Sequence, residues 1–141
     1  MSDNGSDFAR SMSIATSGLR AQAGRMRVIS ENIANAESTA PTAGGEPYRR
    51  KVPTFSSTLD RTLDARVVTL GKVRPDQSDF RVKHEPGNPA ADAAGNVRYP
   101  NVNPLVEMTD MREAQRSYEA NLNIISATRR MIQRTLDILK A

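Results

Sequence analysis

The chain has 141 residues, the usual size of one domain. Hydrophobic residues make up 38% of it and aromatic residues only 4%, so part of the burial is expected to come from other chains rather than from a large core of its own. The net charge of +4 arises from 20 cations interspersed with 16 acids, which is weak support for a nucleic-acid partner, and the lack of Cys excludes disulfides and cysteine nucleophiles.

Residues 1–6 are expected to form a flexible tail and residues 7–37 a long helix. Apolar side chains recur there at alternating spacings of four and three residues, the 3.5-residue period of a coiled-coil seam. One seam position, Gln22, is polar. The side chains predicted to pack against other helices are Phe8, Met12, Leu19, Met26, Ile29 and Ile33. The N-terminal stretch has no apolar run suited to a Sec signal peptide, so we expect that any export uses another route.

Residues 38–103 are predicted to form a loop-rich middle segment. Pro and Gly residues near 41–47 stop the helix. Short alternating patches at 48–55, 66–73 and 80–84 are candidate strands, and the turn-rich stretch 85–95 predicts a β-hairpin with a long tip. Large apolar side chains are few, so the segment is expected to have little core and to pack on a partner.

A second long helix is predicted over residues 104–141. Asn103 is a capping residue and Pro104 suits the first helical position. Acids gather early in this helix and cations late, as the helix dipole favours. The predicted packing residues are Met108, Met111, Tyr118, Leu122, Ile124, Ile125, Met131, Ile132, Leu136 and Leu139. Two helices cannot cover so wide an apolar face, which indicates that further helices complete it and that the chain is an assembly subunit.

No catalytic constellation is present in the sequence. His84 is the only His and has no Ser or carboxylate placed for catalysis, and the glycines form no phosphate loop. Asp76 and Asp79 are interpreted as solvated turn acids rather than a calcium loop, which would also need a loop Gly and a terminal Glu. We expect no enzyme activity, no cofactor and no metal.

The run Tyr48, Arg49, Arg50 and Lys51 raises the question of nucleic-acid binding. A nucleic-acid site would show more cations on one face with aromatics between them, whereas cations on an edge strand also discourage unwanted strand pairing. The second interpretation is preferred. A basic helical scaffold that associates with nucleic acid is the alternative function.

Four segments resemble the flagellar axial proteins, the family of rod, hook and related subunits. The first is SGLRAQAGRMRVISENIANAEST at 17–39, in which Glu31 stands where the family usually has Asn. Residues 47–55, 85–104 and 107–140 are similar to its rod subunits. The resemblance implies a mainly α fold, in which the two long helices form an antiparallel, coiled-coil-like pair beside a small β-hairpin segment.

The same resemblance implies a function. The chain would be a structural subunit of the proximal rod, the drive shaft of the bacterial flagellum, where its terminal helices polymerise, transmit torque and line the export channel. It would be exported by the flagellar type III system to the periplasmic part of the basal body. Implied partners are other proximal and distal rod proteins, the membrane ring or export-gate base, and copies of itself, with no substrate, nucleic acid or membrane span. The run at 48–51 would then contact a neighbouring subunit.

The antiparallel pairing allows a prediction about charge. If Ala36 lies near Leu105, Arg25 and Arg27 lie near Glu113, and Arg20 lies near Glu119. Arg10 would then lie near the cations Arg129, Arg130 and Arg134, so this end is expected to meet carboxylates of another rod protein or of the export gate. Two interpretations stay open for the polar seam positions Gln22, Gln115 and Arg129: they set the helix register, or they face solvent or the channel.

Overall fold

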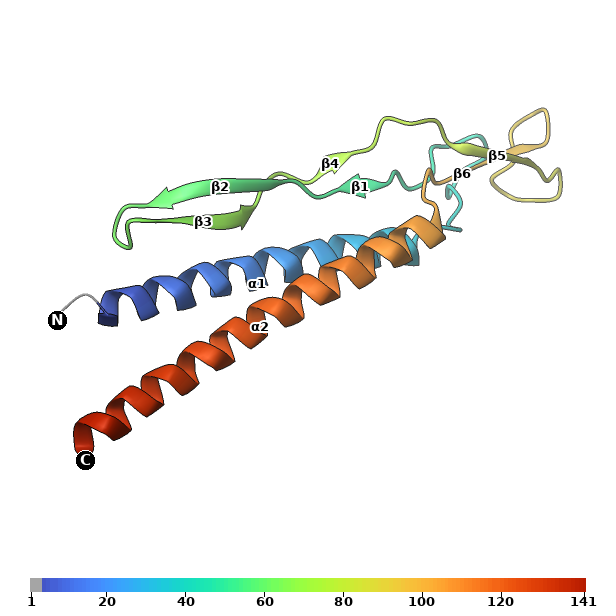
Figure 1. Ribbon diagram of the computed structural model, residues 1–141. Coiled ribbons are helices and arrows are strands. Elements are labelled where there is room, and N and C mark those ends of the chain that lie inside the picture. Colours follow the sequence, from blue (N-terminus) through green and yellow to red (C-terminus); the bar gives the residue numbers. More distant parts are fainter. Residues whose placement is uncertain (1–3) are drawn as a thin grey trace. The chain divides into compact units, whose positions relative to one another are not determined.

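The structure is a computed structural model that describes residues 4–141 (Figure 1). Two long helices, α1 (Asn4–Ala34) and α2 (Pro104–Lys140), flank a segment of short strands. The strands are β1 (Lys51–Val52), β2 (Phe55–Asp60), β3 (Ala65–Leu70), β4 (Arg74–Pro75), β5 (Arg81–His84) and β6 (Asn96–Tyr99). The mainly α fold with a small sheet-containing middle is therefore confirmed.

The chain divides into two compact units, and each long helix contributes to both. Of the described residues, the first unit contains 4–26, 54–72 and 113–141, and the second contains 27–53 and 73–112.

The helix ends follow local chemistry. The helix α1 begins at Asn4, three residues earlier than predicted, so residues 4–6 of the expected tail are helical. Residues 1–3 of that expected tail lie outside the described part. It also ends three residues early, because Asn35 and Ser38 form a turn in which the Ser38 hydroxyl donates to the Asn35 carbonyl at 2.8 Å. The predicted start of α2 is confirmed: the Asn103 side chain accepts a hydrogen bond from the Leu105 amide at 3.1 Å.

In the first unit, α1 and α2 run antiparallel. Arg25 pairs with Glu113 at 3.3 Å, whereas Gly18, seven residues earlier on α1, lies against Asn121, eight residues later on α2. A Cβ atom at Gly18 would lie 2.9 Å from the Asn121 amide nitrogen, so the absence of a side chain there lets the helices approach closely. The predicted pairing of Arg25 with Glu113 is confirmed.

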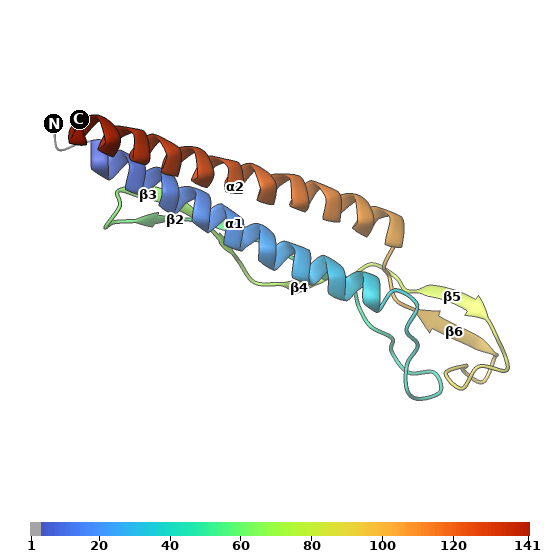
Figure 2. The same ribbon diagram turned by 90° about the horizontal axis from the view of Figure 1, so that it is seen from below.

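The β2–β3 hairpin lies on α1 in the same unit (Figures 1 and 2). Its antiparallel register pairs Phe55 with Leu70 and Asp60 with Ala65. The Val68 amide donates to the Ser17 hydroxyl of α1 at 3.2 Å, which fixes the hairpin to the helix. The sequence had placed strands at 48–55 and 66–73, so most of β2 and its pairing with β3 were missed.

The second unit contains the predicted long-tipped hairpin, β5–β6. Arg81 pairs with Tyr99 and His84 with Asn96 across its antiparallel strands (Figure 2). A small core lies beside it, where Val97 and Val102 are almost fully buried. The hairpin is confirmed. Within residues 4–141, the core beside it is a cluster of only Ala90, Val97 and Tyr99, which agrees with the expectation that the middle segment builds little core.

Candidate assembly interface

The apolar side chains of α2 divide into a covered row and an uncovered one. Of the predicted packing residues, Met111, Tyr118, Ile125 and Ile132 are half-buried, on the side where Ala114 is fully buried. The others are exposed: Met108, Leu122, Ile124, Met131, Leu136 and Leu139. The chain by itself therefore covers only one side of the apolar face of α2.

The predicted packing residues of α1 are better covered. Ile29 is 2% exposed. The remaining five, Phe8, Met12, Leu19, Met26 and Ile33, are half-buried. In the first unit α1 contacts both α2 and the β2–β3 hairpin, which explains why less of its apolar surface is left open.

The three polar seam positions have different surroundings. The side-chain oxygen of Gln22 is buried and accepts no hydrogen bond from any residue of 4–141. Gln115 and Arg129 are exposed on α2. Solvent exposure thus accounts for Gln115 and Arg129 in the single chain but not for the Gln22 oxygen.

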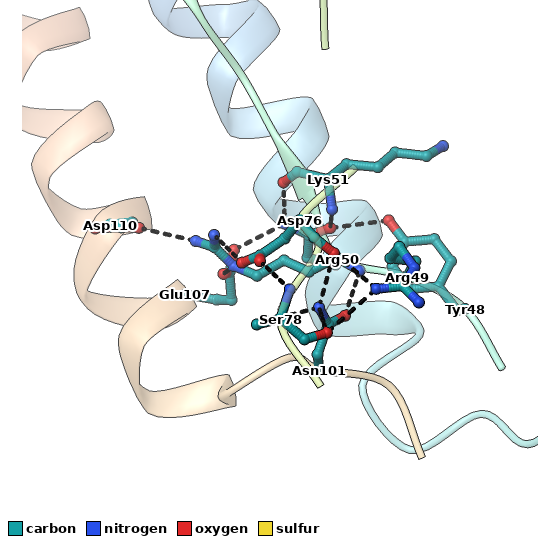
Figure 3. Close-up of polar contacts among 10 residues, drawn as sticks. Tyr48, Arg49, Arg50, Lys51, Asp76, Ser78, Asn101, Glu107 and Asp110 are labelled. Carbon is teal, nitrogen blue, oxygen red and sulfur yellow. Dashed lines mark hydrogen bonds and ion pairs between the residues drawn. The ribbon is translucent and has the colours of Figure 1, made fainter. Parts of the chain in front are cut away.

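The middle cation of the basic run points into the chain. The Arg50 Nε donates to Glu107 Oε1 at 2.6 Å, and its two remaining guanidinium nitrogens lie 3.4 Å from Asp76 and 3.8 Å from Asp110 (Figure 3). Burial acts to lower the pKa of Arg50, but the hydrogen bonds and charges of Glu107 and Asp76 outweigh it and raise that pKa. Arg50 therefore stays charged at the centre of a polar junction.

The other side of the junction is organised by Asn32 near the end of α1. Asn32 is fully buried, and its amide nitrogen donates to the Lys51 carbonyl at 2.8 Å and to Glu107 Oε2 at 3.1 Å. Its oxygen accepts from the Tyr48 hydroxyl at 2.8 Å and from the Lys51 amide at 2.9 Å. Burial first, and then the charges of Glu31 and Glu107, raise the pKa of Tyr48 to about 12, so its hydroxyl remains a donor.

Arg49 and Asn101 hold the loop after β4. Arg49 donates to the carbonyls of Asp76 and Ser78 at 3.0 and 3.2 Å, and its guanidinium lies 4.2 Å from the centre of the Phe80 ring. Asn101 donates to the same two carbonyls and accepts from the Arg50 amide at 2.8 Å (Figure 3). These contacts fasten the basic run to the loop rather than leaving it free.

The Lys51 side chain is more exposed than that of its neighbour Arg50, at 42% against 21%. Its ammonium group pairs with Glu31, and both side chains are 42% exposed. Glu31 thus provides the carboxylate that pairs with Lys51. A groove of about 640 Å³ lies beside this pair, lined by Val28, Glu31, Tyr48, Arg49, Lys51, Val73 and Pro75.

Sequence reasoning missed the buried partners Asn32 and Glu107 and the half-buried Asn101. One signal could have found Glu107: it lies seven residues before the buried Ala114, so an acid occupies the covered face of α2. The junction brings together cations and carboxylates already satisfied by one another, which suits a structural role. Within the described residues, no cluster of three or more His, Cys, Asp or Glu side chains could hold a metal ion.

Comparison with known proteins places these helices in a family. A family model described as "Flagella basal body rod protein" matches residues 12–40, and one described as "Flagellar basal body rod FlgEFG protein C-terminal" matches residues 93–138. A FlgC rod protein of Agrobacterium fabrum is 54% identical over 128 residues, covering 91% of this chain and 92% of the relative. The chain belongs to the FlgC family of flagellar basal-body rod proteins.

More distant members of the FlgC family are also similar in sequence to this chain over most of its length. The Bacillus subtilis protein is 39% identical, covering 92% of this chain and 97% of its own, and the Aquifex aeolicus protein is 38% identical, covering 95% and 98%. The chain is a structural subunit of the flagellar rod and not an enzyme. Nothing supports the nucleic-acid alternative. None of the helices in residues 4–141 combines the length and the apolar character needed to cross a membrane.

Proposed function

We propose that the chain polymerises into the proximal rod through the faces of its terminal helices. The observation that carries this proposal is the exposure of large apolar side chains on α2, with Ile124 46%, Met131 54% and Leu139 77% exposed. Contiguous apolar surface of this kind marks interaction sites in soluble proteins. Neighbouring helices would cover these side chains, complete the core and transmit torque between subunits.

The proposed contacts are heterologous, with one face of a subunit meeting a different face of the next. Such contacts build open helical filaments rather than closed dimers. The neighbours would be other proximal and distal rod proteins, the membrane ring or export-gate base, and further copies of the chain. Helices arranged in this way would also surround the export channel.

The same exposure supports export by the flagellar type III system to the periplasmic rod. A chain that depends on neighbours to cover its helices gains much of its stability only after incorporation, which couples folding to assembly. The unassembled subunit would therefore unfold readily for passage through a narrow channel.

The residues 48–51 form the proposed outer contact. Arg50 is committed to the junction within the chain, so the surface offered to a neighbouring subunit consists of Tyr48, Arg49 and Lys51 around the groove described above. The groove is lined by apolar residues, the cations Arg49 and Lys51 and the acid Glu31, so an apolar side chain flanked by a carboxylate on the cationic side would suit it.

Complementation of a deletion strain tests polymerisation through the helix faces. The deletion should leave basal bodies without a rod in electron micrographs, and wild type should restore it. Ile124→Asp should be produced but fail to restore rods, because it places a charge on an apolar contact. Val82→Asp is the matched control, since Val82 is 61% exposed and belongs to the strand β5 rather than to a helix face.

The outcomes distinguish the rod function from polymerisation through the helix faces. Normal rods in the deletion strain would overturn the rod function. Normal rods with Ile124→Asp, or equal failure of Val82→Asp, would overturn polymerisation through the helix faces. Ile125→Asp should also fail, with loss of the subunit fold, because Ile125 lies half-buried on the covered side of α2.

A further inference from the structure

We propose that the outward stripe of α2, defined as Ile124, Met131 and Ile138, binds an amphipathic helix from a different rod protein whose apolar seam is edged by carboxylates. This inference rests on the proposed rod assembly and specifies the partner's chemistry at one surface. The outward stripe and the arginines beside it all belong to the first compact unit.

The outward stripe has the geometry of a helix-binding seam. Its three side chains are seven residues apart and are 46%, 54% and 76% exposed. At 3.6 residues per turn, Ala120 and Ala127 lie on the same side of α2, and their small side chains allow a second helix to approach closely. The seven-residue spacing matches the repeat with which two helices interlock their side chains.

Cations follow one edge of the outward stripe. Arg116, Arg130 and Arg134 are exposed on that edge, and none of them forms an ion pair with another residue of 4–141. The nearby acid Asp137 accepts a hydrogen bond from Gln133 at 2.9 Å and lies further round the helix. Three uncompensated arginines beside an apolar seam favour a partner with carboxylates at the matching positions.

A second copy of the chain has few free carboxylates on its helices, since only Glu119 and Asp137 among their described acids form no ion pair with another residue of 4–141. The helix α1 carries Arg10, Arg20, Arg25 and Arg27 against only two described acids, Asp7 and Glu31. The acids of the first half of α2 are mostly engaged within the chain: Glu107 and Asp110 contact Arg50, and Glu113 pairs with Arg25. The charge pattern therefore indicates a helix of another rod protein.

Charge reversal tests the inference in the deletion strain. The variant Arg130→Glu/Arg134→Glu should reduce the amount of the chain in purified basal bodies, relative to its amount in whole cells, by at least about tenfold, because like charges would face each other across the contact. Arg130→Lys/Arg134→Lys keeps the charge and should assemble nearly as well as wild type. The matched control Arg61→Glu/Arg66→Glu changes the net charge by the same amount, but on the β2–β3 hairpin, and should not reduce assembly.

Several results would overturn the inference without touching the rod function. These are normal incorporation of the charge-reversal variant, an equal loss in the Lys variant, or an equal loss in the hairpin control. Absence of the wild-type chain from basal bodies would instead overturn the rod function itself.

Crosslinking identifies the partner. Since the chain has no Cys, Met131→Cys provides a single attachment point for a maleimide–diazirine crosslinker in purified basal bodies. Mass spectrometry should locate the crosslink on a helix of another rod protein with Asp or Glu within one turn. A crosslink to a second copy of the chain, or to a segment without carboxylates, would overturn the inference.

Discussion

Arg50 donates a 2.6 Å hydrogen bond to Glu107, and only 1% of the Glu107 side chain is exposed. Arg50 lies directly before the strand β1, and Glu107 lies in the first turn of α2, 57 residues further along the chain. The bond therefore fastens the start of α2 to the strand region of the second unit. Removing one partner of a buried ion pair leaves the other charge desolvated and unpaired, which costs far more than an exposed pair contributes.

The first prediction compares two neighbouring cations. Arg50→Ala should lower the free energy of unfolding by about 3 kcal/mol, because it leaves the buried Glu107 carboxylate without its cation. Lys51→Ala should lower it by less than about 1 kcal/mol, because the pair with Glu31 is largely solvated. Urea denaturation of the full chain followed by circular dichroism measures both. Similar losses for the two variants would show that the junction does not depend on the buried pair.

The second prediction concerns acid stability and Asp76. Hydrogen bonds from the backbone amide and hydroxyl of Ser78, and then from Arg50, lower the pKa of Asp76 in the folded chain. A carboxyl with a lowered folded pKa contributes stability above its unfolded pKa of about 3.9, and this contribution is lost as the pH falls through the folded value. The stability advantage of wild type over Asp76→Asn should therefore shrink between neutral pH and the acid range.

Unfolding free energies of both proteins at a series of pH values test this expectation. A difference between wild type and Asp76→Asn that stays constant from neutral pH into the acid range would mean that the Asp76 charge contributes nothing to folding.

The elements that the sequence predicted are those fixed by local chemistry. The long helices followed from the 3.5-residue period and from the cap at Asn103, and the β5–β6 hairpin followed from its turn-rich tip. The pair Arg25 and Glu113 could be predicted because, once one contact between two antiparallel helices is assumed, the helix geometry fixes which residues lie opposite each other along the rest of the pair.

The elements that the sequence did not predict depend on tertiary contacts. The β2–β3 hairpin turns between Asp60 and Asp64 without the Asn-Gly or Gly-rich signals typical of a two-residue turn. The Asp60 side chain instead accepts from the Thr62 amide at 2.9 Å. The polar junction joins side chains from four distant segments, so no short motif contains it.

The third prediction concerns Gly24 on α1, which lies under Leu70 of the hairpin. A Cβ atom at Gly24 would lie 2.7 Å from a methyl carbon of Leu70. An alanine in a helix interior is favoured over glycine by about 1 kcal/mol, but in wild type the contact with Leu70 should cancel most of that gain. In a Leu70→Ala background the gain should reappear.

A double-mutant cycle of Gly24→Ala and Leu70→Ala measures this coupling in the free energy of unfolding. The expected coupling is of the order of 1 kcal/mol, in favour of the double variant. Additive effects of the two substitutions would mean that the hairpin does not rest against Gly24 in solution.

The fourth prediction uses Asn32, whose amide nitrogen donates to Glu107 from a fully buried position. Asn32→Asp replaces that donor by a carboxylate facing another carboxylate, so it should destabilise the second unit more than Asn32→Ala at neutral pH. Burial and the charge of Glu107 should raise the pKa of the introduced carboxyl. The penalty should therefore be present at neutral pH and decrease as the pH falls and that carboxyl binds a proton.

This pH dependence is opposite in sign to the one expected for Asp76, because here a folded pKa is raised rather than lowered. Hydrogen exchange of amides in the second unit, compared between Asn32→Asp and Asn32→Ala at neutral and mildly acidic pH, measures it. If the Asp variant is the more protected one at neutral pH, the Asn32 side chain does not act as a donor to Glu107. If the gap between the variants instead widens as the pH falls, the introduced carboxyl stays charged and the junction is more hydrated than the buried contacts indicate.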